Sequence, residues 1–196
     1  VPASNISVST VGNPDGIRRL GELAAEPGFH RLNLAVSLNA PNDAIRAEIM
    51  PVDRAWPMDD LMDAMLDWPG RPKSAICVEY VLIPGVNDGL EHCDEVCEYL
   101  RPLRCSLNVI PYNPRRDSPW PAPTESSVDA FIGRAVDRGQ FTKRRGTKGR
   151  DVMAACGQLG NPEIRKRRRV ATGEPVPVTV RGDRTIGDAF KASPPA

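Results

Sequence analysis

The stretch "AICVEYVLI", residues 75–83, decides how the sequence folds. It is a short run of β-branched, aromatic and other apolar residues, typical of a buried strand and far shorter than the roughly 18 residues of a membrane span. Three similar runs are "NISVST" (5–10), "NLAVSL" (33–38) and "CSLNVIP" (105–111). Because the apolar residues are continuous rather than alternating, we expect parallel strands with both faces covered.

Segments with helical periodicity lie between these strands and follow the last of them. They span residues 14–25, 40–50, 58–68, 89–100 and 124–139. Asn42 or Asp43 is expected to cap the second segment, and Thr124 and Gly139 to begin and end the last. The apolar positions expected to face the core are Leu61, Met62, Met65 and Leu66, then Leu90, Cys93, Val96, Cys97 and Leu100, then Val128, Phe131, Ile132, Ala135 and Val136.

The alternation of strands and helices predicts an α/β protein built of parallel β/α units. Polar residues gather where the strands end, and the carboxyl ends of strands build the active site of β/α barrels. These residues are Ser9, Thr10, Ser37, Asn39 and Asn113. Four units are too few to close an eight-unit barrel, so we expect residues 1–160 to form part of one.

The composition, with 40% hydrophobic and 26% charged residues, is that of a globular protein large enough for one core. No apolar run is long enough to cross a membrane, and no signal peptide is visible. The five cysteines are odd in number and lack the spacing of a secreted disulfide framework, which predicts a cytoplasmic environment. Because a strand follows Val1 almost at once, we expect the chain to be cut out of a longer protein.

A net charge of +1 conceals a strongly basic block at residues 143–169. The block holds ten Lys or Arg residues and two acids, whereas the rest of the chain holds 16 basic and 23 acidic residues. Such blocks often contact phosphates, although "IRKRRR" (164–169) is equally compatible with a solvated basic face. From about residue 170 the chain is rich in Pro and Gly, so we expect residues 161–196 to form a basic segment and a flexible tail.

Packing accounts for four of the five cysteines. Cys93 and Cys97 form a CxxxC pattern on the apolar stripe of a helix, and leucine occupies the third position of an iron–sulfur CxxxCxxC signature. Cys77 and Cys105 lie within strands, so no metal site is expected in this chain. Glu79 interrupts an apolar strand and needs a partner or a raised pKa, which leaves open whether it contacts a ligand or only a neighbouring strand.

Cys156 differs from the other cysteines. It lies in "DVMAACGQLG" (151–160), away from any apolar stripe, and follows the closely spaced cations Arg145, Lys148 and Arg150. Nearby positive charge favours the thiolate, which is the nucleophilic form of cysteine. The pattern therefore indicates either a reactive thiol or a tight loop packed against the end of a barrel.

Five motifs together resemble the RlmN/Cfr family of radical-SAM RNA methyltransferases. They are "ISVSTVG" (6–12), "LAVSLNAPND" (34–43), "EYVLIPGVNDG" (79–89), "NVIPYNP" (108–114) and "AACGQLG" (154–160), in the family's order and spacing. The resemblance covers roughly residues 5–160 and implies the C-terminal half of a partial TIM-type β/α barrel. It also implies a cytoplasmic, monomeric enzyme whose 4Fe–4S cluster is held by cysteines upstream of Val1.

The resemblance implies an RlmN-type methylation of adenine C-2 in 23S rRNA, and in tRNA as a further substrate. Ser9, Ser37, Leu38, Asn39 and Asn113 match residues that bind S-adenosylmethionine (SAM) in the family. Cys156 matches the cysteine that takes a methyl group from one SAM. A radical made from a second SAM then removes a hydrogen from that methyl group, and the resulting sulfur-bound methylene radical adds to the ring.

Two alternatives share these motifs. A Cfr-like enzyme would modify C-8 of adenine, and an inactive paralogue or fragment would only bind RNA. The chain also departs from the family pattern at three positions: Asn39 replaces a histidine, and Arg150 and Met153 replace acids. The first departure affects the SAM segment, and the other two alter the charge near Cys156.

Overall fold

The computed structural model describes residues 2–50, 56–70, 74–114 and 118–146, and two short strands near the C-terminus. The chain divides into two units, Val1–Leu159 and Gly160–Ala196. In the second unit, β6 (Thr179–Val180) pairs antiparallel with β7 (Arg184–Thr185) inside the segment predicted to be a flexible tail. The remaining paragraphs concern the first unit.

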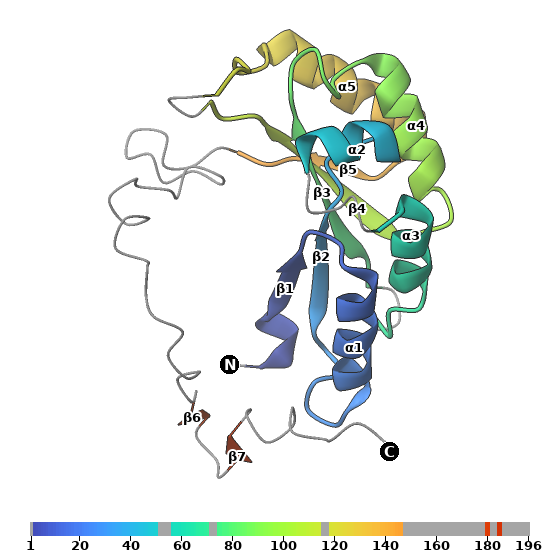
Figure 1. The fold of residues 1–196 in the computed structure, drawn as a ribbon, viewed down its shortest axis with the longest axis vertical. Coiled ribbons are helices and arrows are strands. Elements are labelled where there is room, and N and C mark those ends of the chain that lie inside the picture. Colours follow the sequence, from blue (N-terminus) through green and yellow to red (C-terminus); the bar gives the residue numbers. More distant parts are fainter. Residues whose placement is uncertain are drawn as a thin grey trace. The chain divides into compact units, whose positions relative to one another are not determined.

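A five-stranded parallel sheet forms the centre of the first unit (Figure 1). Its strands run in the order β1 (Ser7–Thr10), β2 (Asn33–Ser37), β3 (Ile76–Leu82), β4 (Cys105–Pro111) and β5 (Thr142–Arg144). The prediction of parallel β/α units is thereby confirmed. The first strand is shorter than predicted, because Ala3–Asn5 form a turn of 3₁₀ helix, η1.

Helices connect the strands near the predicted places. They are α1 (Pro14–Ala25), α2 (Asp43–Ile49), α3 (Met58–Leu66), α4 (Leu90–Leu100) and α5 (Glu125–Asp137). Asn42 caps α2 by accepting a hydrogen bond from Ile45 N, and Thr124 caps α5 in the same way through Ser127 N. Gly139 ends α5 with a φ of 81°, in the left-handed region that glycine enters without strain.

Within the described residues the helices lie on one face of the sheet, whereas the sequence predicted strands with both faces covered. Figure 1 shows α1, α3, α4 and α5 on the same side of the sheet. In β3 and β4, buried residues alternate with half-buried ones along the whole strand. The half-buried set in β3 is Cys77, Glu79 and Val81, which face away from the helices. We call this uncovered side of the sheet the polar face.

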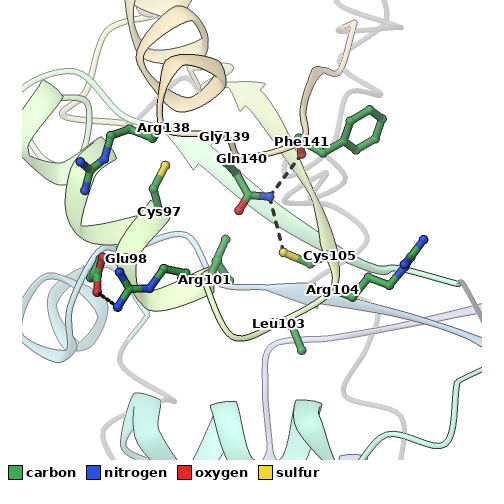
Figure 2. Close-up of a pocket in the computed structure, with 11 residues that line it drawn as sticks. Cys97, Glu98, Arg101, Leu103, Arg104, Cys105, Arg138, Gly139, Gln140 and Phe141 are labelled. Atoms are coloured by element: carbon green, nitrogen blue, oxygen red, sulfur yellow. Dashed lines mark hydrogen bonds and ion pairs between the residues drawn. The ribbon is translucent and has the colours of Figure 1, made fainter.

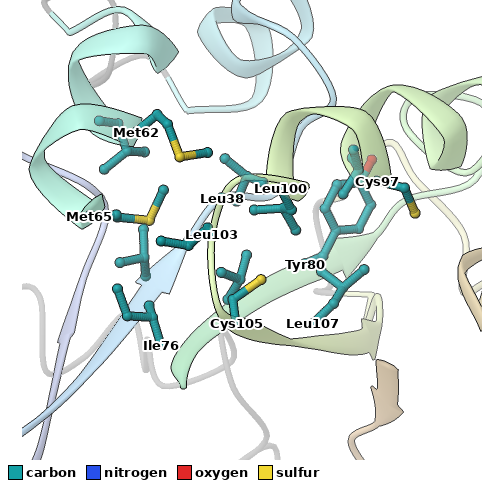
Figure 3. Packing of buried hydrophobic residues seen from close by; sticks show 14 of the residues in the cluster. Leu38, Met62, Met65, Ile76, Tyr80, Cys97, Leu100, Leu103, Cys105 and Leu107 are labelled. Carbon is teal, nitrogen blue, oxygen red and sulfur yellow. The ribbon is translucent and has the colours of Figure 1, made fainter. Parts of the chain in front are cut away.

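The core lies between the sheet and the helices. Figure 3 shows Met62 and Met65 of α3 and Leu100 of α4 within the same buried cluster as Leu107 of β4. Phe131 of α5 is fully buried there, and its ring stacks on that of Tyr80 with 5.3 Å between centroids. Three predicted core positions are instead exposed: Leu66, Leu90 and Val136. Each lies at the edge of its apolar stripe or at the end of its helix, beyond the reach of the sheet.

We expect the truncation of two apolar side chains of α5 to change the free energy of unfolding by very different amounts. Phe131→Ala should lower the free energy of unfolding by about 3–5 kcal/mol, because it empties a fully buried site. Val136→Ala should cost less than about 0.5 kcal/mol, because this side chain is 54% exposed. Urea denaturation of the complete protein measures both, and equal costs would contradict the packing described above.

Candidate functional site

The polar residues singled out from the sequence lie where the strands end. Ser9 is in β1, Ser37 ends β2, Leu38 and Asn39 follow β2, and Asn113 follows β4. Because the strands are parallel, their carboxyl ends share one edge of the sheet, which we call the carboxyl edge. Ligands of α/β proteins bind at this edge.

Ser9 and Ser37 are accessible from the polar face. Ser9 is exposed and pairs in register with Ala35 of β2, while Ser37 is half-buried and pairs with Glu79 of β3. Side chains two residues apart on a strand point to the same side. Ser9 therefore lies on the same face as Ser37. It is on the neighbouring strand, level with Ala35, and so two residues further from the carboxyl edge.

Leu38 has a different environment from the two serines. Its side chain is fully buried in the core, on the side of the sheet that faces the helices. Its backbone N–H donates to the carbonyl oxygen of Glu79 at 3.0 Å, and its own carbonyl accepts from Nε of Arg46 at 3.4 Å. Leu38 thus anchors the segment, and its predicted contact with SAM stays a prediction.

Asn39 adopts a conformation that few residues tolerate. Its φ is 59°, the one positive value at a non-glycine residue in the described part of the chain, and asparagine enters this region more easily than most residues. Its Oδ1 accepts a hydrogen bond from Val81 N at 2.9 Å, and its Nδ2 donates to Sδ of Met50 at 3.3 Å. The side chain that replaces the family's histidine is therefore engaged in holding β3 and α2.

Asn113 supplies a polar group without a partner. Its Nδ2 is buried and makes no hydrogen bond within the described residues. Leaving such a donor unsatisfied is costly, so it calls for a partner such as an ordered water, an ion or a bound molecule. An amide donor and two serine hydroxyls along one edge of the sheet are the kinds of group that the carboxylate, ribose and adenine of SAM can hydrogen-bond, and their contact with SAM stays a prediction.

The centre of the polar face holds an ion pair. Glu79 Oε1 lies 2.5 Å from Nη1 of Arg145, which follows β5 and donates its backbone N–H to Val109 of β4. The Glu79 side chain is 16% exposed. Next to it, Nδ2 of Asn108 donates to Sγ of Cys77 at 3.0 Å. The partner that Glu79 needs is therefore Arg145, a contact across the sheet.

The described thiols differ in acidity. Burial, followed by the negative charge of Glu79, raises the pKa of Cys77, and burial raises the pKa of Cys105 to about 11. A hydrogen bond with Cys97 raises the pKa of Cys93 and lowers that of Cys97. Among these four thiols, Cys97 is the one whose pKa is lowered.

Cys97 lies away from the carboxyl edge, near the amino end of β4. It lines a pocket of about 400 Å³ with Arg101, Arg138, Cys105 and Phe141, where α4 and α5 end and β4 begins (Figure 2). Cys93 and Cys97 are both buried, as expected for packed thiols. Cys77 is instead half-buried on the polar face, where its Sγ accepts a hydrogen bond from Asn108.

Cys156 and most of the basic block lie outside the described residues. Within the described part of the chain, no group of three or more His, Cys, Asp or Glu residues could hold a metal ion. These residues therefore do not fit a 4Fe–4S cluster, which needs cysteine ligands. None of the described helices is long and apolar enough to cross a membrane.

Sequence reasoning did not predict the structural roles of three residues: Arg46 and Asn87 at the carboxyl edge, and Arg145 on the polar face. Asn87 was recognised only as one residue of the turn motif "PGVND" (84–88), without a role of its own. Arg46 carries no signal of burial, because arginine in an amphipathic helix usually faces solvent. Arg145 belongs to a basic stretch, and the three residues that precede it form β5.

Comparisons with known proteins give close relatives. The chain is 38% identical over 166 residues to the "Probable dual-specificity RNA methyltransferase RlmN 1" of Protochlamydia amoebophila, covering 84% of this chain and 45% of that protein. It is 38% identical over 162 residues to the "Dual-specificity RNA methyltransferase RlmN" of Syntrophus aciditrophicus, covering 83% and 45%. The chain thus spans about half the length of the curated relatives it matches. No family model matches.

Solved structures agree with these relatives. The crystal structure of a radical SAM methyltransferase from Sphaerobacter thermophilus superposes with a TM-score of 0.72 at 37% identity, covering 80% of this chain and 44% of that one. A domain of a pyruvate-formate lyase-activating enzyme from Bacteroides vulgatus superposes with a TM-score of 0.53 at 16% identity, covering 71% and 80%. The latter likeness concerns the fold alone. The sheet is therefore part of a radical-SAM partial barrel, as the sequence predicted.

The Glu79–Arg145 pair should couple more strongly than an ordinary surface pair. In a double-mutant cycle with Glu79→Gln and Arg145→Met, we expect a coupling free energy of about 1 kcal/mol, because Glu79 is largely shielded from water. The matched control is Glu98–Arg101, whose side chains are 53% and 76% exposed and should couple by about 0.3 kcal/mol. Chemical denaturation gives both values, and a weaker coupling for Glu79 would show that the polar face is fully hydrated.

Proposed function

Because this chain belongs to the RlmN/Cfr family of radical-SAM RNA methyltransferases, we propose that the complete protein transfers a methyl group from SAM to C-2 of an adenine. Its proposed substrates are 23S rRNA and tRNA, its proposed location is the cytoplasm, and its proposed oligomeric state is a monomer. The sustained identity to relatives named dual-specificity RNA methyltransferases supports this proposal best.

The carboxyl edge is the proposed SAM site. Asn113 donates its buried Nδ2 to the ligand, and the Ser9 and Ser37 hydroxyls bind it from the polar face. Asn39 contributes through its backbone, since its side chain is hydrogen-bonded to Val81 and Met50. Such a role makes the replacement of histidine by asparagine at this position compatible with binding.

Cys156 is the proposed methyl carrier. SAM supplies an electrophilic methyl group, and a 4Fe–4S cluster bound outside the described residues supplies the electron for radical formation. The thiolate of Cys156 is the group that accepts the methyl, and its basic sequence neighbourhood favours that ionised form. An aromatic C–H carbon is a poor target for polar methyl transfer, which is why a carrier and a radical route are needed.

Nucleoside analysis tests the activity itself. The complete protein, with its cluster reconstituted, should convert adenosine in 23S rRNA fragments and tRNA to 2-methyladenosine, detected by mass spectrometry after digestion. Formation of 8-methyladenosine would identify a Cfr-like enzyme. RNA binding without any methylated product, by protein with a full cluster, would identify an inactive paralogue.

The identity of the carrier has its own test. Protein isolated from cells should hold a methyl group on the peptide that contains Cys156, and Cys156→Ala should abolish RNA methylation while leaving iron content and SAM cleavage intact. Cys97→Ala is the control, because Cys97 is the most acidic described thiol yet is buried away from the carboxyl edge. This substitution should only weaken packing and lower the free energy of unfolding by about 1 kcal/mol. Loss of chemistry in folded Cys97→Ala would mean that Cys156 is the wrong thiol.

The basic block should govern the salt dependence of RNA binding. If four to six of its Lys and Arg residues contact phosphates, the slope of log affinity against log salt concentration should be about −3 to −5. Changing Arg167, Arg168 and Arg169 together to Ala should make this slope shallower by about two units. An unchanged slope would show that these arginines form a solvated face only.

A further inference from the structure

Asn87 is a polar side chain enclosed by the fold. It lies in the turn between β3 and α4 and is fully buried. Its Nδ2 donates to the carbonyl oxygens of Asn39, at 2.7 Å, and Val81, at 2.8 Å. Its Oδ1 accepts from Ile83 N at 2.6 Å. One side chain thus joins the segment after β2 to the end of β3.

Arg46 holds the preceding carbonyl group of the same segment. It lies in α2, is 1% exposed, and donates from Nε to the carbonyl oxygen of Leu38 at 3.4 Å. Its Nη2 donates at 2.7 Å to the carbonyl oxygen of Val11, just after β1. Gly12 leaves room for this contact, because a Cβ atom there would lie 2.7 Å from Nη2.

Two consecutive carbonyl groups, those of Leu38 and Asn39, are therefore held by buried side chains from two different elements. The same segment is held from a third direction, because Leu38 N and Asn39 N both donate to the carbonyl oxygen of Glu79, at 3.0 and 3.3 Å. Regular pairing of β2 with β3 ends at Ser37 and Glu79. Beyond that point, side chains take over the role of the missing strand contacts.

We propose that Arg46 and Asn87 are positioning residues for SAM, which fix the backbone of Leu38 and Asn39 in the conformation that binds it. The inference rests on the proposed function, because it takes this segment as part of the SAM site. Neither side chain needs to touch SAM, since both are buried behind the segment. Arg46 also fixes the end of β1 beside Ser9, so it aligns two of the proposed contact segments at once.

The test measures affinity for S-adenosylhomocysteine, a product that the enzyme does not consume, by calorimetry on the complete protein. Asn87→Asp keeps the shape of the side chain but replaces two donors with an acceptor that faces two carbonyl oxygens. Arg46→Lys keeps the charge but loses the fork that spans two carbonyl groups. We expect each change to weaken binding at least tenfold.

Leu103→Ala is the matched control for stability. Leu103 is a buried core residue between α4 and the amino end of β4, at the end of the sheet opposite the carboxyl edge, so the change should lower the melting temperature while S-adenosylhomocysteine binds with wild-type affinity. All proteins are compared at a temperature at which circular dichroism shows them folded. Weakened binding in the control, in proportion to its lost stability, would overturn the inference.

Hydrogen exchange on the wild-type protein keeps the test independent of whether the variants fold. S-adenosylhomocysteine should slow exchange of the amides of Leu38 and Asn39, measured on the peptide that contains them. If the wild-type protein binds the ligand but this peptide is unaffected, or if both variants bind as tightly as wild type, the inference fails and the proposed function survives. If the wild-type protein with its cluster does not bind the ligand at all, the proposed function fails.

Discussion

The carboxyl edge of a parallel sheet poses a problem of hydrogen bonding. Where the strands stop, their last N–H and C=O groups lose partners while remaining next to the core, and an unpaired buried polar group is costly. Here the solution is a set of side-chain amides and one guanidinium. Asn39, Asn87 and Arg46 replace the contacts that a longer strand would have made. The shape of the candidate site follows from this requirement.

The same requirement explains why Asn113 stands out. The amide of Asn87 at this edge is fully used, with three hydrogen bonds from one side chain. The buried Nδ2 of Asn113 has no such bond within the described residues. Since Asn39 and Asn87 are satisfied by the protein itself, the unsatisfied donor of Asn113 is the observation that supports the proposed ligand site at this edge.

Local sequence patterns predicted the elements of the fold but not the contacts between them. Runs of apolar residues located β2, β3 and β4, and capping residues located the start of α2 and α5, because both signals depend on a few adjacent residues. By contrast, β5 is short and polar and becomes a strand only by pairing with β4. The partner of Glu79 was also out of reach, since Arg145 lies 66 residues further along the chain. Burial of Arg46 depends on three separate segments and has no local signature.

The alternation of the two faces along each strand has a consequence for how such a protein can change. In β3, Ile76, Val78, Tyr80 and Leu82 build the core, while the residues between them form the polar face. Alternate residues of the same strand thus serve stability and the site. Substitutions on the polar face can alter the site while leaving the core intact. Loss or gain of one residue within the strand would exchange the two sets, so strand length is constrained more tightly than the identity of any single residue.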